Sequence, residues 1–357
     1  RNNSFSTDLT YRLPLEAKKW FLDFRYDFEA EKRVNTESTF DFDEASQAYD
    51  DFNFALSTDF VNKNSVSTPS AKLVYNSEKM NFGIGSGYSF RTIENNDVLR
   101  PELSLKRKFE FIQLDANFNY RFNPKMSLYF DYDYDNNAPA ISQLQPFQNV
   151  SDPLNTITGN PNLKPTKQHS AYLGFNQFDF QKGTGFYIYA NGSLNYDQVV
   201  SKTTVDENFV RNTTYENVDG GYWSYIGGSY SKDFKVDSLQ TIKVRTGMNA
   251  SFNKSINFNN GVEYASVTNS MTPTLSVEYK WKQLFEIRPN YRLSFTRTKF
   301  DLVDFDDQNF LRHNLGIRTA TFFPKKLEWR NDINYTYNPN VADGFQKSSW
   351  FWNSTLA

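Results

Sequence analysis

The chain has 357 residues, and its 39 basic and 41 acidic side chains give a formal net charge of −2. This balance provides no concentrated basic surface for nucleic acid, and the absence of cysteine excludes disulfides and thiolate metal sites. Aromatic residues make up 17% of the chain although the mean hydropathy is −0.68, and no run approaches the ~18 apolar residues of a membrane helix.

Alternation of apolar and polar residues begins near Phe5 and recurs along the whole chain. From Ile112 to Phe122 every second residue is apolar, and after the turn at Asn123 to Lys125 the pattern resumes from Met126 to Tyr134. Successive side chains of a strand point to opposite faces, so this stretch predicts a hairpin with one apolar and one polar face. The same pattern returns in segments 186–196, 242–252, 275–295 and 311–335.

The connections between the predicted strands alternate between short turns and long polar segments. The long segments lie at about 34–50, 92–108, 136–167, 200–220 and 256–272. Short periplasmic turns and long extracellular loops are typical of transmembrane β-barrels. The hairpins predict about 14–16 strands, although segment 58–71 does not fit simple alternation unless it is one long strand with a bulge.

A secreted propeller or solenoid is the main alternative fold. Such proteins use strands of about 5–6 residues and repeat every ~20–50 residues, whereas this chain shows no repeat and longer alternating runs. Aromatic residues also stand at predicted strand ends, where interfacial girdles belong: Trp20, Tyr134, Trp281, Phe322, Phe323 and Trp329. We therefore predict an all-β fold, a transmembrane antiparallel up-and-down β-barrel domain over residues 1–357, located in the outer membrane.

The polar faces of the strands would line the lumen of such a barrel. Charged residues on these faces could pair between adjoining strands, and the wall could contact a plug or a solute. A hydrated, ion-paired wall is the commoner role for any single residue. The predicted lumen-facing residues are Glu286, Arg288, Arg292, Glu328, Arg330 and Asp332.

The stretch from Asn136 to Ser170, NNAPAISQLQPFQNVSDPLNTITGNPNLKPTKQHS, resembles the barrel of TonB-dependent-receptor-like outer-membrane proteins of the Bacteroidetes type. In that family an xPxxxQLxP loop follows a strand, and GNPxLKPxxxHS leads into the next strand. The closing WFWNSTLA is similar to a late strand of the family. The residues that match the loop motif are Pro139, Gln143, Leu144, Pro146, Gly159, Asn160, Pro161, Leu163, Lys164, Pro165 and His169.

Proline fixes φ and lacks a backbone donor, and glycine allows a sharp turn, so we expect this extracellular motif to fold over the barrel mouth as a preformed ledge. We interpret His169 as a satisfied residue at the membrane interface rather than as a ligand-binding residue.

The resemblance implies a receptor that takes up a nutrient ligand captured by extracellular loops. Its implied surroundings are outer-membrane lipids and lipopolysaccharide, with a TonB-type energy complex, a surface lipoprotein or other outer-membrane subunits as partners. Family barrels carry an N-terminal plug and further strands, which are not recognisable here and which we expect outside this sequence. The alternative is an accessory or structural barrel subunit of a larger complex for secretion, surface attachment or outer-membrane protein assembly.

The sequence contains no nucleophile elbow, P-loop, dinucleotide fingerprint or zinc-binding histidine pair, so we predict neither an enzyme nor a cofactor. Two acidic clusters could hold structural calcium through carboxylate oxygens. Neither cluster has the glycine and distal glutamate of an EF-hand, which favours a solvated run of charges. The clusters are Asp41, Asp43 and Glu44, and Asp304, Asp306 and Asp307.

Overall fold

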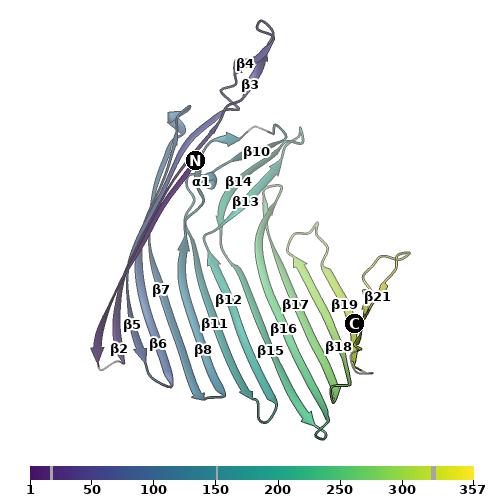
Figure 1. Ribbon diagram of the computed structural model, residues 1–357. Coiled ribbons are helices and arrows are strands. Elements are labelled where there is room, and N and C mark those ends of the chain that lie inside the picture. The colour runs from purple at the N-terminus through teal and green to yellow at the C-terminus, as the bar shows by residue number, and fades with distance from the viewer. Residues whose placement is uncertain (17–18, 150–151, 323–326) are drawn as a thin grey trace.

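A computed structural model describes the chain except for residues 17–18, 150–151 and 323–326. Its main feature is a 15-stranded sheet in which the strands follow one another in chain order, and every pair of neighbours is antiparallel (Figure 1). This arrangement confirms the predicted all-β, up-and-down architecture and its strand number. Within the described residues, no helix is long and apolar enough to cross a membrane.

The strands of the main sheet are β1 (Asn2–Glu16), β2 (Trp20–Glu37), β5 (Thr58–Asn76), β6 (Met80–Asp97), β7 (Leu105–Asn123), β8 (Met126–Asn137), β11 (Thr166–Asp179), β12 (Thr184–Tyr196), β15 (Gly221–Lys235), β16 (Gln240–Asn259), β17 (Val262–Trp281), β18 (Phe285–Phe300), β19 (Gln308–Thr321), β20 (Trp329–Tyr337) and β21 (Ser348–Leu356). The remaining elements are β3 (Phe40–Asp43), β4 (Ala48–Phe52), η1 (Pro101–Leu103), α1 (Ile141–Leu144), β9 (Gln148–Asn149), β10 (Asn155–Thr158), β13 (Gln198–Val205) and β14 (Arg211–Val218).

Short connections gather at one end of the sheet, which we call the turn end; the opposite end is the loop end (Figure 1). Trp20 begins β2, Trp281 ends β17 and Trp329 begins β20, so these predicted girdle residues lie at strand ends near the turn end. Phe323 lies outside the described residues. The short connections of the turn end include 77–79, 124–125, 180–183, 236–239 and 282–284.

Several of the predicted loops are wrong because the strands continue past the point where apolar alternation ends. Strands β16 and β17 stay paired up to a tight turn at Asn260 and Gly261, whose φ angles of 46° and 80° suit an Asn-Gly hairpin turn. The predicted loop at 256–272 is therefore a protruding hairpin, and the loop at 200–220 contains the hairpin β13–β14. The loop predicted at 92–108 shrinks to residues 98–104.

The predicted bulge in segment 58–71 is also wrong. Strand β5 pairs with β2 from Thr58 to Tyr75 without a register shift. The small hairpin β3–β4 stands between β2 and β5, which is why this connection broke the simple alternation of turns and loops. Strands β1 and β21 end the strand order, and among the described residues each pairs with one neighbour.

The two faces of the sheet differ as the alternation predicts. We call the face that exposes large apolar side chains such as Ile84, Leu275 and Leu315 the outer face. The opposite, inner face carries mostly polar and charged residues along the same strands. Near the loop end, however, the inner face also bears an apolar patch, and this patch positions the site described next.

Candidate functional site at the loop end

A second, four-stranded sheet lies at the loop end, with the order β13-β14-β10-β9 (Figure 1). Strand β10 precedes β11 in the chain and pairs in parallel with β14, which follows β12. We call α1, residues 145–165 and the hairpin β13–β14 the ledge. The ledge combines two loops, which are separate in the sequence, into one folded unit.

Two leucines of the sequence motif anchor the ledge to the inner face. Leu144 and Leu163 are 0% and 1% exposed, and they pack with Ile93 of β6 and with Phe109 and Phe111 of β7. Full burial of a leucine side chain contributes about 1.5–3 kcal/mol, so this pair outweighs most single polar contacts of the ledge. The motif leucines therefore have a structural role.

The QL and GNP parts of the motif meet at Gly159. The Asn160 N–H donates to the Gln143 carbonyl at 2.6 Å, and the Gln143 side chain accepts a hydrogen bond from the Ala140 N–H at 2.8 Å. A Cβ on Gly159 would overlap the Gln145 carbonyl oxygen and lie 2.7 Å from the Gln145 nitrogen. Close backbone approach therefore requires glycine here.

The prolines of the motif stand where the backbone leaves regular structure. Pro139 and Pro146 flank the short helix α1, and Pro165 directly precedes β11. The Pro161 carbonyl accepts a hydrogen bond from the Arg107 guanidinium of β7 at 2.5 Å, which adds a polar anchor beside Leu163.

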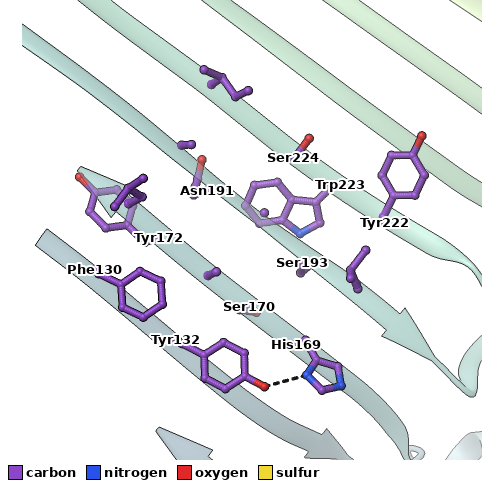
Figure 2. Close-up of a pocket in the computed structure, with 16 residues that line it drawn as sticks. Phe130, Tyr132, His169, Ser170, Tyr172, Asn191, Ser193, Tyr222, Trp223 and Ser224 are labelled. Atoms are coloured by element: carbon purple, nitrogen blue, oxygen red, sulfur yellow. Dashed lines mark hydrogen bonds between the residues drawn. The ribbon is translucent and has the colours of Figure 1, made fainter. Parts of the chain in front are cut away.

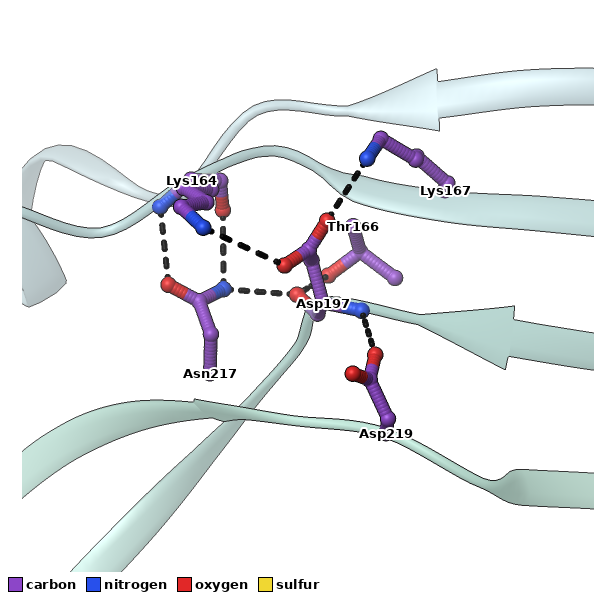
Figure 3. Close-up of polar contacts among 6 residues, drawn as sticks. All are labelled: Lys164, Thr166, Lys167, Asp197, Asn217 and Asp219. Carbon is purple, nitrogen blue, oxygen red and sulfur yellow. Dashed lines mark hydrogen bonds and ion pairs between the residues drawn. The ribbon is translucent and has the colours of Figure 1, made fainter.

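The end of the motif connects to the point where β12 leaves the main sheet and becomes β13. Asp197 occupies this junction with a φ of 50°, and Figure 3 shows its carboxylate between Lys164 and Lys167, with N···O distances of 3.9 and 2.8 Å. The Asn217 side chain accepts from the Lys164 N–H at 2.8 Å and donates to the Lys164 and Asp197 carbonyls at 3.0 and 2.6 Å. These contacts fasten β14 to the motif.

His169 lies on the outer face, opposite Tyr134 of β8. Its Nδ1 is 2.8 Å from the Tyr132 hydroxyl, so the ring has a hydrogen-bond partner within the protein. Figure 2 shows it at the edge of an outer-face groove of about 490 Å³, whose lining includes the small residues Ala171, Gly192 and Ser224. The same 2.8 Å contact joins Tyr291 and His313, so both histidines of the chain have a tyrosine partner.

The predicted charged residues of β18 and β20 share the inner face, but their predicted pairing needs correction. Strand β19 lies between β18 and β20, so these two strands do not adjoin. Arg288 instead pairs with Glu286 at 2.8 Å and with Glu278 of β17 at 2.9 Å. Arg292 lies on the same face of β18 as Arg288, farther toward the loop end.

The intervening strand supplies a residue that the sequence analysis missed. Arg318 of β19 pairs with Asp332 at 3.0 Å, and Arg330 contacts Glu328. A cavity of about 470 Å³ brings Glu286, Arg288, Arg318, Arg330 and Asp332 together. Arg318 alternates with Ile317 and could have been assigned to the inner face by its phase.

One further ion pair on the inner face joins two strands that are not neighbours in the sheet. Lys72 of β5 contacts Asp115 of β7 over Gly85 of β6, which lies between them in register. A Cβ on Gly85 would overlap the Asp115 carboxylate, so the missing side chain permits the pair.

The acidic clusters serve as local hydrogen-bond acceptors. Asp41 accepts from the Asn53 side chain at 2.7 Å, and the Ala45 N–H, donating at 2.9 Å, lowers the pKa of Asp43. Asp307 pairs with Arg297 at 3.4 Å. Within the described ranges, no three His, Cys, Asp or Glu side chains are grouped to hold a metal ion, and calcium binding stays a prediction.

Several solved structures are similar to this chain. The copper transporter OprC aligns with a TM-score of 0.53 at 11% identity, covering 93% of this chain and 50% of that chain. A variant of the ferric enterobactin receptor from Pseudomonas aeruginosa gives 0.41 at 11% identity, with 93% and 57% covered. The siderophore receptor PirA from Pseudomonas aeruginosa gives 0.37 at 12% identity, with 100% and 70% covered.

The chain thus spans about half the length of the copper transporter, and that likeness shows a shared fold. No curated protein sequence matches the chain. A family model, described as the outer membrane protein β-barrel family, matches residues 1–329. This match covers most of the 15-stranded sheet with its apolar outer face, and the chain therefore belongs to the outer membrane protein β-barrel family.

Proposed function

We propose that this chain is the barrel portion of a TonB-dependent-receptor-like protein of the Bacteroidetes type, which takes up a nutrient ligand captured at the loop end. The observation that carries the proposal is the ledge, which is anchored to the inner face by Leu144 and Leu163. It leaves cavities of about 400 and 860 Å³ beside α1, each lined by both polar and apolar residues. Loops folded inward around open cavities of mixed polarity suit ligand capture better than surface attachment.

On this proposal the loop end faces the outside and the turn end faces the periplasm, as in other outer-membrane barrels. Further strands of the same protein would pair with β1 and β21, because free strand edges leave N–H and C=O groups unsatisfied in lipid. A plug would fill the inside, and a TonB-type energy complex would act on it from the periplasm. Lipids and lipopolysaccharide would cover the outer face.

The test is uptake in whole cells. Wild-type cells, cells lacking the gene and cells lacking the energy complex would be given copper salts, ferric siderophores, oligosaccharides and peptides, and depletion of each from the medium would be measured. We expect one ligand class whose depletion is lost in both mutant strains.

If no ligand depends on both the gene and the energy complex, the receptor proposal fails. Co-purification of the protein with other outer-membrane subunits would then favour the accessory barrel. In that case, the charged cavity that includes Arg288, Arg318 and Asp332 would be a contact surface for another subunit of the assembly.

A further inference from the structure

The smaller of the two cavities beside α1 lies between the motif and the inner face of the sheet. Its volume is about 400 Å³, and residues 138–142, which lead into α1, close one side of it. We call it the α1 recess. Its other side is formed by residues of β2, β5 and β6, among them Glu31, Arg33, Asn62, Asn64 and Arg91.

Polar atoms on the walls of the α1 recess are buried without partners. Asn62 Oδ1, Asn64 Oδ1 and Arg91 Nε form no hydrogen bond with any residue that the structure describes. Asn62 and Asn64 of β5 lie in register with Asn95 and Ile93 of β6. Arg91 precedes Ile93 by two residues and therefore lies on the same inner face of β6. Buried polar groups are almost always hydrogen-bonded in native proteins, so a partner from outside this set is expected.

The adjoining cavity has a mixed lining of polar and apolar residues. Ser142 of α1 lines both the α1 recess and this second cavity of about 860 Å³. Gln145 also lines the second cavity; it is only 9% exposed, and its Nε2 has no hydrogen-bond partner within the described chain. The second cavity therefore also has an amide donor without a partner in the described part of the chain, on the far side of α1.

The three cations that line the recess differ in their ion pairs. Arg33 pairs with Glu31 at 3.1 Å, and Lys63 shares Glu94 with Lys106, at 3.5 and 3.2 Å. Arg91 forms no ion pair with the described residues; the carboxylate of Glu29 of β2 attracts its charge across the intervening Val66 of β5 without contacting it. The guanidinium geometry suits a planar oxyanion, which it can bind through two parallel hydrogen bonds.

We propose that the α1 recess binds the carboxylate of an organic anion, with Arg91 holding the carboxylate and Asn62 and Asn64 binding neutral polar groups beside it. This names the chemical class of the ligand and therefore rests on the proposed function where it concerns uptake. A peptide with a free C-terminus and a uronic acid share this chemistry. The experiment distinguishes them.

The test uses the full-length protein purified in detergent and two pairs of probes. N-acetyl-trialanine is compared with its C-terminal amide, and galacturonate is compared with galactose. We expect at least one carboxylate probe to raise the unfolding temperature at millimolar concentration, while its neutral analogue leaves that temperature unchanged. The pair that responds identifies the peptide or the sugar acid.

Arg91→Met should weaken binding of the active probe at least tenfold. It should also raise the unfolding temperature of the probe-free protein, because it removes a half-buried cation whose buried Nε lacks a hydrogen-bond partner among the described residues. Arg245→Met is the matched control, since Arg245 is an exposed inner-face residue of β16, far along the sheet. It should leave both quantities unchanged.

Three results would overturn the inference: no carboxylate probe binds, Arg91→Met and Arg245→Met behave alike, or Arg91→Met lowers the stability of the probe-free protein. The last result would mean that the protein itself satisfies Arg91. These outcomes are separate from the proposed function. If energy-dependent uptake survives Arg91→Met, the inferred carboxylate site in the α1 recess is wrong and the receptor proposal stands. If carboxylate binding occurs without any uptake, the receptor proposal is wrong and the carboxylate site stands.

Discussion

Single residues of the motif act mainly by packing the ledge against the inner face. Leu144 and Leu163 are buried, Gly159 permits backbone contact, and Arg107 holds the Pro161 carbonyl. A motif that looks like a binding loop in sequence is thus mostly a folding device. The polar atoms in the α1 recess without hydrogen-bond partners in the described structure belong to its neighbours on β5 and β6.

At this scale we predict that Leu163→Ala loosens the ledge. Truncating a buried leucine costs about 2–5 kcal/mol, because it removes buried surface and leaves a cavity. Hydrogen exchange and limited proteolysis should show faster opening of residues 145–165, while the strands of the main sheet stay protected. Leu154→Ala is the control, since Leu154 lies in the same loop and is 60% exposed. Equal protection in the two variants would contradict the anchoring role of Leu163.

The strands are the elements whose alternating sequence pattern fits the membrane environment. Each strand of the main sheet presents one face to lipid and the other to the interior, and side chains one residue apart experience different solvents. Strand β18 illustrates this with Leu293 on the outer face and Ser294 on the inner face, in phase with Glu286 and Arg288.

We predict that Leu293→Arg destabilises the barrel by about 2–4 kcal/mol, the cost of a basic residue near the bilayer midplane. Ser294→Arg, one residue away, should cost much less, because the inner face already carries arginines. Urea unfolding in lipid vesicles would measure both free energies. Comparable losses in the two variants would mean that the faces are assigned wrongly.

The whole molecule is a long up-and-down sheet with its elaborations concentrated at one end. The hairpin β3–β4, the ledge and the protruding hairpin β16–β17 all lie at the loop end, and the turn end has short connections (Figure 1). This asymmetry predicts the orientation of the protein in the outer membrane.

We predict that an epitope inserted at residues 44–47, the tip of the hairpin β3–β4, binds antibody on intact cells. An insertion at residues 124–125, between β7 and β8, should bind only after the outer membrane is opened. Labelling of the second site alone on intact cells would show an inverted topology.

The sequence by itself determined the strands, their two faces and the family of the fold. These depend on a period of two residues, which is a local property, and on the apolar residues that lipid requires at alternate positions. Residues such as Leu293 and Arg288 could therefore be assigned to opposite faces without a structure. The match of the motif to a family of barrels likewise needed only neighbouring residues.

The tertiary structure alone decided which distant residues meet. It placed β19, with Arg318, between β18 and β20, where Arg318 pairs with Asp332. It also brought Lys72 into contact with Asp115 over Gly85, and it packed the ledge against Phe109 on the inner face. It also extended β16 and β17 beyond the alternating pattern, where Ile256 and Ala265 are buried against Val218 of β14. Register and loop packing depend on contacts far apart in the chain, and a local period does not encode them.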